Sequence, residues 1–390
     1  MDFSLSDVQK AFRAMARDFM SDKKTQQWIA AAEHNKGFPY DFMEKAAEHG
    51  LLGMNVSEKY GGAGMSVLDA VTVIEEIAYW SVPFSLNILV QNSLAAFPIE
   101  TFGTEEQKAK YLPKMVSGEL LGCFANTEAG VGSDAKNIVT KAVRKDGKLL
   151  LIGFKRFITS ASVANVAVVF ARTSPRTAGN PGTTAFLIDI GENAPGFLLT
   201  KVEKKYGQSG SMLCEFILDD YVADEKNILG KLNQGWEVCD GTFRHSRNFI
   251  AAQGAGLARR ALDEALKYVA ERITFGKPLI ENQALGFELA KMDIEIEAAR
   301  LLTYKAAFEE DVKDKNFHLT SSKAKYATGE AVKKMALLYY QYCGGMSVSS
   351  DSLSSKLLLD ALPIPIYEGP SEIQLQILWK HLQQVAKTLK

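Results

Sequence analysis

The periodicity of apolar residues changes twice along this chain, from helical to strand-like and back to helical. Apolar residues recur every three or four positions up to about residue 120, short β-rich runs separated by turn residues follow, and helical spacing returns after Gly235. Helices at both ends and short strands in the middle require separate layers of packing. The sequence therefore predicts an α+β protein with domains at residues 1–120, 121–229 and 230–390.

Boundary signals accompany the helical stretches. In the first region helices are expected at 9–20, 41–52, 68–80 and 85–97. Thr104 and Gln107 have the spacing of a capping box at the start of the next helix. In the last region helices are expected at 257–269, 285–299, 321–342 and 372–389. Long helices with short connections are typical of an up-down bundle.

The middle region is rich in β-branched and aromatic residues. Strands are expected at 149–152, 166–170, 185–188 and 214–218. A turn-rich segment with prolines and glycines, residues 172–182, separates two of them. Several short strands at this spacing favour a small barrel or sandwich.

Charge and composition exclude several classes of function. The net charge is −1 and the isoelectric point is about 6.6, with no basic stripe, so no nucleic-acid partner is expected. No apolar run approaches the ~20 residues of a membrane span, so no membrane insertion is expected. The N-terminus lacks a signal-peptide pattern, which favours a cytosolic or already mature protein. The four cysteines are scattered, which disfavours a disulfide framework or a zinc site.

One carboxylate near the C-terminus has two interpretations. Glu368 stands before a glycine in Tyr-Glu-Gly-Pro-Ser, between an apolar run and an amphipathic closing helix. It is either a general base that reaches into a buried cleft or a first-turn helix charge favoured by the macrodipole. This stretch alone leaves both open.

Four further motifs precede Glu368. They are Phe-Ala-Asn-Thr-Glu-Ala-Gly-Val-Gly-Ser-Asp at 124–134, Lys-Arg-Phe-Ile-Thr-Ser at 155–160, Arg-Ile-Thr-Phe-Gly-Lys-Pro-Leu at 272–279 followed by Gln283, and Gln-Tyr-Cys-Gly-Gly at 341–345. Their order and the length of the chain resemble the acyl-CoA dehydrogenase family over essentially the whole sequence. The resemblance implies an N-terminal helical domain, a central β-barrel or sandwich and a C-terminal four-helix bundle.

The resemblance also implies the site. Glu368 aligns with the catalytic base, and Ser246 occupies the position where a subset of the family carries its base instead. The implied cofactor is FAD, with cofactor-binding residues Phe124, Asn126, Thr127, Gly132, Ser133, Phe157, Ile158, Thr159, Arg272, Thr274, Phe275, Gln283, Gln341, Gly344, Gly345, Pro370, Ser371 and Glu372. The implied acyl-CoA substrate would contact Ser133, Arg244, Arg247, Tyr367 and Gly369.

The implied reaction is α,β-dehydrogenation of an acyl-CoA thioester. Glu368 would remove the α-proton while the β-hydrogen leaves as hydride to flavin N5, and burial should raise the pKa of this carboxyl group. The family further implies an electron-transfer flavoprotein as acceptor and a homotetramer or dimer in which Arg272 reaches a neighbour's FAD. A role in fatty acid or carboxylic acid catabolism is expected, in a bacterial cytoplasm or, as the less favoured alternative, an organellar matrix.

Two further observations bear on this interpretation. Arg244, His245 and Arg247 suit CoA phosphates or a carboxylate on the acyl group, or else form a solvated helix start. The chain departs from the family pattern at Met346-Ser347-Val348, Leu359 and Pro370, where Pro370 replaces a threonine. These departures keep alternatives open: enoyl-CoA reduction, desulfination, or a non-catalytic protein that binds flavin or CoA.

Overall fold

Helices around a shared apolar core form the first region. The computed structural model describes residues 4–177, 179–191 and 193–389. The elements are α1 (Asp7–Ser21), α2 (Lys23–Asn35), α3 (Tyr40–Glu48), η1 (Glu58–Tyr60), α4 (Val67–Trp80), α5 (Val82–Leu89), η2 (Val90–Ala96), α6 (Phe97–Phe102) and α7 (Glu105–Val116). The capping box is confirmed: Gln107 N donates to Thr104 Oγ1 over 3.2 Å, and Thr104 N donates to Gln107 Oε1 over 3.0 Å.

The helical stretch Val82–Phe102 corrects one expectation. By length and composition it would suffice to cross a membrane, although no such run was expected. In the structure 94% of its most apolar window is buried inside the protein. Its composition is therefore explained by its place in the core of the first region.

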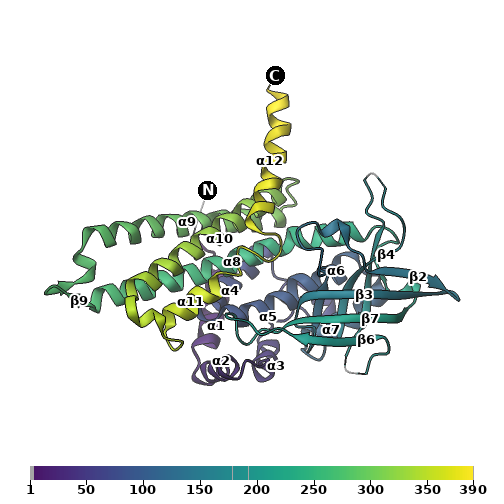
Figure 1. Ribbon diagram of the computed structural model, residues 1–390, viewed down its shortest axis with the longest axis horizontal. Coiled ribbons are helices and arrows are strands. Elements are labelled where there is room, and N and C mark those ends of the chain that lie inside the picture. Colours follow the sequence, from purple (N-terminus) through teal and green to yellow (C-terminus); the bar gives the residue numbers. More distant parts are fainter. Residues whose placement is uncertain (1–3, 178, 192, 390) are drawn as a thin grey trace.

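The middle region is one mixed eight-stranded sheet. Its strands and short helices are β1 (Gly122–Ala125), η3 (Ala135–Asn137), β2 (Lys141–Lys145), β3 (Lys148–Thr159), β4 (Val166–Arg172), β5 (Thr183–Asp189), β6 (Phe197–Val202), β7 (Leu213–Ala223), η4 (Glu225–Asn227) and β8 (Ile228–Leu229). The order is β6-β7-β3-β2-β4-β5-β8, with β1 parallel to β4. The sheet lies at one end of the elongated molecule (Figure 1).

Long helices form the last region. They are α8 (Gly235–Glu271), α9 (Gln283–Asp311), α10 (Phe317–Cys343), α11 (Leu353–Ala361) and α12 (Ser371–Thr388), with the hairpin β9 (Ile273–Thr274) and β10 (Lys277–Pro278) and the 3-10 turns η5 (Leu279–Glu281) and η6 (Gly344–Val348). α8 runs through the middle of the molecule, the β9–β10 hairpin lies at the end opposite the sheet, and α12 projects outward (Figure 1).

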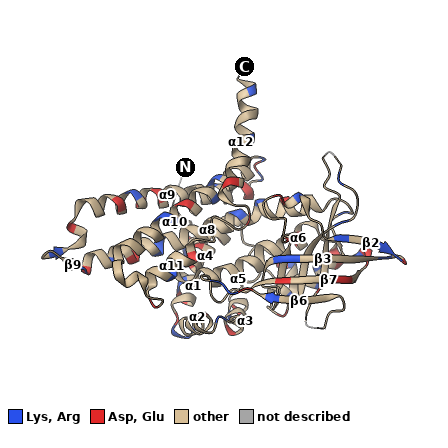
Figure 2. Cartoon of the chain, in the orientation of Figure 1, with Lys and Arg blue, Asp and Glu red and all other residues tan. Residues whose placement is uncertain are grey.

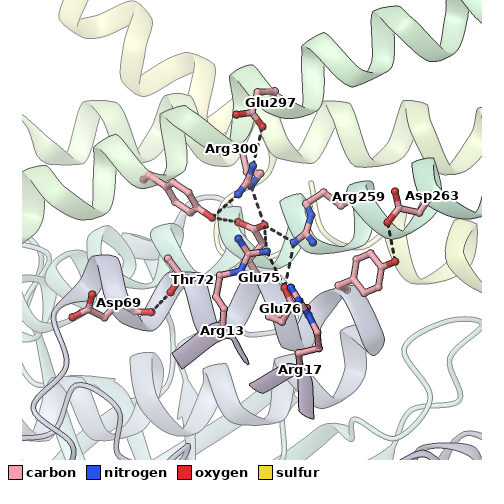
Figure 3. A network of polar contacts seen from close by, with 12 residues as sticks. Arg13, Arg17, Asp69, Thr72, Glu75, Glu76, Arg259, Asp263, Glu297 and Arg300 are labelled. Atoms are coloured by element: carbon pink, nitrogen blue, oxygen red, sulfur yellow. Dashed lines mark hydrogen bonds and ion pairs between the residues drawn. The ribbon is translucent and has the colours of Figure 1, made fainter. Parts of the chain in front are cut away.

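A buried ionic network joins the first and last regions (Figure 3). Glu75 and Glu76 are adjacent on α4 and both are buried. Arg259 on α8 and Arg300 on α9 reach Glu75 at 2.6 and 2.9 Å. Glu76 is held at 2.9 Å by Arg13 and Arg17 of α1, which lower the pKa of its carboxyl group against the effect of burial. The network therefore fixes α8, the helix that carries Ser246, relative to α1, α4 and α9.

Candidate active site

Glu368 lies in a strained turn that precedes α12. The helix begins at Ser371, and Pro370 occupies its N-cap position without a side-chain capping bond, so Glu368 is outside the helix and is not a first-turn charge. Its φ is 53° and that of Gly369 is 91°. A non-glycine residue in the left-handed region costs about 1–3 kcal/mol and persists only where its surroundings enforce it. The structure therefore disfavours the helix-charge interpretation of Glu368.

The Glu368 carboxylate faces α8. Ser246 Oγ donates a hydrogen bond to Glu368 Oε2. Burial raises the pKa of the Glu368 carboxyl group to about 7, although the Ser246 hydrogen bond and the charges of Lys325 and Arg247 oppose that rise. A carboxyl group with a pKa of about 7 exchanges a proton readily near neutral pH.

Lys325 belongs to this site, although it lies in none of the five sequence motifs. It lies on α10, and its Nζ donates to the backbone oxygens of Pro365 and Gly369 at 3.2 and 2.6 Å. A signal was present in the sequence, because Lys325 stands on the same helical stripe as the buried Thr328 and Val332. A charge on a buried stripe requires polar partners.

The three basic residues near the start of α8 have separate surroundings. Arg244 pairs with Asp240 at 2.6 Å. His245 is buried, with its Nδ1 2.8 Å from Glu310 Oε1. Arg247 is 7% exposed, and its buried Nε has no hydrogen-bond partner among the described residues. Arg247 thus keeps an unmet donor near Glu368, and the Nε2 of His245 is likewise without a hydrogen-bond partner among the described residues.

Tyr367 connects the turn to two other elements. Its hydroxyl donates to Gln253 Oε1 on α8 and accepts from Gln208 Nε2, which lies 3.4 Å away in the loop between β6 and β7. Two adjacent positions complete the turn: Ser371 Oγ donates to Glu330 Oε1 over 2.9 Å, and Glu372 is exposed in the first turn of α12. The Tyr367 hydroxyl is thus engaged within the chain.

β1 and the loop after it contain buried and exposed members of the predicted cofactor set. Phe124 packs against Phe170 and Phe243, with ring centroids 4.9 and 5.4 Å apart. The carbonyl of the buried Asn126 accepts from Lys155 Nζ over 3.1 Å. The remaining predicted members lie nearer solvent: Thr127 is half-buried, and Gly132 and Ser133 are exposed. This outer part of the loop is open to a ligand.

β3 presents Phe157 on a bulge. The pairing of β3 with β7 shifts register between Lys155 and Ile158, and Phe157 has a φ of 55°. Phe157 is 50% exposed, while Ile158 is buried in the core of the sheet and Thr159 is half-buried. A bulge re-aims side chains out of the ladder. The Arg156 guanidinium lies over the Phe157 ring, 4.6 Å from its centroid.

The other predicted cofactor residues lie far from Glu368. Along α8 the 26 positions from Ser246 to Arg272 span about 39 Å at 1.5 Å per residue. Arg272, Thr274 and Phe275 lie in the segment of the β9–β10 hairpin that follows α8. Gln283 begins α9, and Gln341, Gly344 and Gly345 lie at the end of α10 and in η6, where Tyr342 OH donates to Leu285 O over 3.0 Å. Phe275, at the tip of the hairpin, is 104% exposed. One chain therefore carries two separate groups of predicted cofactor residues.

Comparison with known families accounts for the whole chain. Residues 6–119, 123–221 and 233–383 match the N-terminal, middle and C-terminal domains of acyl-CoA dehydrogenase. The chain belongs to the acyl-CoA dehydrogenase family. A relative named acyl-CoA dehydrogenase from Bacillus subtilis is 39% identical over 97% of this chain and 98% of its own length. The resemblance found in the sequence and the fold expected from it are confirmed.

Solved structures agree with this assignment. The structure of butyryl-CoA dehydrogenase from Megasphaera elsdenii matches with a TM-score of 0.93 and 34% identity over 98% of this chain and all of that one. The FAD complex of PigA matches with a TM-score of 0.93 and 27% identity over 98% of this chain and 99% of that one. The chain is an oxidoreductase of the acyl-CoA dehydrogenase type, and its cofactor is FAD.

Some relatives are named for the opposite reaction. A 3-(aryl)acrylate reductase of Clostridium sporogenes is 34% identical over 97% of this chain and 99% of its own length. The CarC subunit of the caffeyl-CoA reductase–Etf complex of Acetobacterium woodii is 35% identical over 96% of this chain and 97% of its own length. Membership of the acyl-CoA dehydrogenase family thus leaves the physiological direction open.

Proposed function

We propose that this protein oxidises an acyl-CoA thioester between its α- and β-carbons, with Glu368 as the catalytic base. The observation that supports this assignment is the half-buried carboxylate itself, held outside any helix with a pKa of about 7. A base is most effective when its pKa lies near the operating pH. Ser246 supplies no second carboxylate at the alternative position.

In this mechanism the residues around the turn have distinct tasks. Glu368 takes the proton from the α-carbon, and negative charge develops on the thioester oxygen. The backbone N–H of Glu368 has no acceptor among the described residues, so it is free to donate to that oxygen. The unmet Nε of Arg247 is a second donor, available to a polar group of the substrate. When bound, FAD supplies the hydride acceptor for the β-hydrogen.

The residues that would hold FAD come from both groups described above. Phe157 and Thr159 on β3, with Ser133 of the loop after β1, would face the ring. The distant group around Arg272 would reach the FAD of a second copy of the chain. We therefore propose a homo-oligomer, a tetramer or a dimer. It is supported by the length of α8 between Ser246, which contacts Glu368, and Arg272, which is about 39 Å. We also propose that the chain divides into three domains, with boundaries near residues 120 and 230.

Replacement of the base tests the assignment. Glu368→Gln should keep the flavin spectrum and lose the bleaching that an acyl-CoA causes under anaerobic conditions. Glu106→Gln, an exposed carboxylate on α7, is the control and should bleach normally. If Glu368→Gln bleaches at the rate of the unchanged protein, Glu368 is not the base. A panel of straight, branched and dicarboxylic acyl-CoAs would identify the acyl class.

Enoyl-CoA reduction is the second candidate, and the two relatives named as reductases favour it. The same residues would act in reverse, with protonated Glu368 returning a proton to the α-carbon. Initial rates measured in both directions, with oxidised protein plus acyl-CoA and with photoreduced protein plus enoyl-CoA, separate the two. A faster reductive direction at equal substrate concentration would replace the first proposal.

An electron-transfer flavoprotein is the proposed acceptor. One relative is named as part of a reductase–Etf complex, and a similar solved structure, with a TM-score of 0.93 and 33% identity, concerns an electron-transferring flavoprotein of Acidaminococcus fermentans. We also propose a cytoplasmic location in a bacterium and a role in acyl-group catabolism, supported by the bacterial relatives. Turnover that depends on added electron-transfer flavoprotein would test the acceptor.

A further inference from the structure

Lys325 is a buried cation that the proposed reaction does not use. It is 1% exposed, and among the described residues no carboxylate lies within ion-pair distance of it. Its Nζ instead donates to the carbonyls of Pro365 and Gly369 at 3.2 and 2.6 Å. A buried ammonium group is costly, so a lysine that contacts only backbone oxygens needs another reason to be there.

The two carbonyls stand on either side of Glu368. Pro365 precedes it by three positions and Gly369 follows it directly, and both Glu368 and Gly369 have a positive φ. A left-handed turn of this kind must be enforced from outside. Lys325 contacts both ends of the turn from α10, so it restricts the direction in which the Glu368 side chain leaves the backbone.

The charge of Lys325 also acts on the carboxylate. α8 presents Ser246, Arg247 and His245 to Glu368, and α10 presents Lys325. Burial lowers the pKa of the Lys325 ammonium to about 8, and the negative charge of Glu368 opposes that fall. Lys325 is therefore mostly protonated at neutral pH, beside the group proposed as the base.

We propose that Lys325 is a positioning residue for Glu368, which holds the left-handed turn through two carbonyls and places a positive charge beside the carboxylate. This inference rests on the proposed function of Glu368. It adds a requirement that the Tyr-Glu-Gly-Pro-Ser motif does not contain, namely a positive charge supplied by a side chain of α10.

The structure shows why the variants should fold. Pro365 O also accepts from Ser371 N at 3.0 Å, and Gly369 O also accepts from Gln374 Nε2 at 2.8 Å. Replacement of Lys325 therefore leaves neither carbonyl without a donor. Lys325→Met removes both the charge and the donors, and Lys325→Gln keeps an N–H donor without the charge. Lys323→Met, an exposed lysine of the same helix, is the matched control.

The test compares flavin reduction by an acyl-CoA across pH in the holoprotein. For Lys325→Met we expect a rate at pH 7 about 10- to 100-fold lower, since small misplacements of a reacting group have effects of that size. The apparent pKa of the acid limb of the pH profile should rise by about one unit. A nearby cation favours the ionised carboxylate, so its removal favours the protonated form of Glu368. Lys325→Gln should show the same shift with a smaller loss of rate, and Lys323→Met should show neither.

A second readout follows the carboxyl group itself. Difference infrared titration of the holoprotein, with Glu368→Gln to identify the band, should show the same upward move of the Glu368 pKa in Lys325→Met. A loss of rate with an unmoved acid limb and an unmoved band would overturn the inference, because Lys325 would then serve the fold alone. If Glu368→Gln still bleaches, the proposed function fails. If it does not bleach and both Lys325 variants match the unchanged protein, the inference about Lys325 fails alone.

Discussion

Two buried lysines of this protein, Lys155 and Lys325, meet their neighbouring glutamates in different ways. Lys155 Nζ lies 2.8 Å from Glu128 Oε1, and Glu128 also accepts from the backbone N–H groups of Val139 and Thr140. These partners lower the pKa of Glu128 despite its burial. Lys325 instead donates to backbone carbonyls, and burial raises the pKa of Glu368 to about 7.

The difference shows how a fold separates structural charge from reactive charge. Glu128 is locked as a carboxylate by one cation and two N–H donors, which joins the loop after β1 to β3. Among the described residues Glu368 has a single hydrogen-bond donor, Ser246. Lys325, whose charge acts on it, donates to backbone carbonyls instead. A glutamate thus becomes a permanent anion or a titratable base according to where the neighbouring ammonium group is directed.

The largest expected effect comes from breaking the locked pair. Lys155→Met leaves Glu128 buried without its cation, and loss of one partner of a buried ion pair costs about 3–5 kcal/mol. Urea unfolding of the holoprotein should show this loss of stability. Addition of Glu128→Gln to Lys155→Met should restore part of it, since no buried charge then remains unpaired. If the free energy of unfolding of Lys155→Met lies within about 1 kcal/mol of that of the unchanged protein, the Lys155–Glu128 ion pair does not stabilise the fold as predicted.

Replacement of the titratable glutamate, Glu368, should raise the stability of the folded protein, whereas replacement of Lys155 lowers it. Below its ordinary pKa of 4.5 Glu368 is protonated in both the folded and the unfolded chain. Between pH 4.5 and about 7 the unfolded chain releases a proton that the folded chain keeps, so the folded protein loses stability as the pH rises. Glu368→Gln cannot lose that proton and should be more stable by about 1–3 kcal/mol at pH 8.

The control for this prediction is the pH itself. The stability difference between Glu368→Gln and the unchanged protein should shrink toward zero near pH 4.5, as measured by urea unfolding at several pH values. Equal differences at pH 4.5 and pH 8 would show that the effect comes from packing or hydrogen bonding, and that Glu368 is not held at a raised pKa.

Much of the fold could be predicted from the sequence, because its local signals agree with the tertiary packing. Thr104 and Gln107 form the expected capping box, and the stripe around Leu257 lies on the buried face of α8. α2 was not expected, since its sequence Lys23–Asn35 begins with polar residues and buries only part of one face. β6 was missed for a similar reason: Leu198 and Leu199 are exposed on an edge strand and show no alternation.

The candidate site was only partly predictable, because its key contacts join distant parts of the chain. Motif order pointed to Glu368, yet nothing local shows that the residue adopts a left-handed conformation or that Lys325 reaches around it. Ser246 was expected only as an empty position for a base. The structure gives it a role, since its hydroxyl binds the carboxylate 122 positions away. Side-chain contacts of such separation depend on how helices pack, which periodicity does not specify.

The smallest expected effect concerns that serine. Ser246→Ala removes the hydrogen bond that favours the ionised carboxylate, so the pKa of Glu368 should rise and the acid limb of flavin reduction should move upward by about 0.5 unit, in line with a net hydrogen-bond contribution of about 0.5–1.5 kcal/mol. Ser322→Ala, a buried serine bonded to the carbonyl of its own helix residue His318, is the control and should leave the limb in place. If Ser246→Ala instead moved the acid limb to lower pH, the serine would stabilise the protonated form of Glu368. The number of hydrogen-bond donors would then not explain why Glu128 is a permanent anion and Glu368 a titratable base.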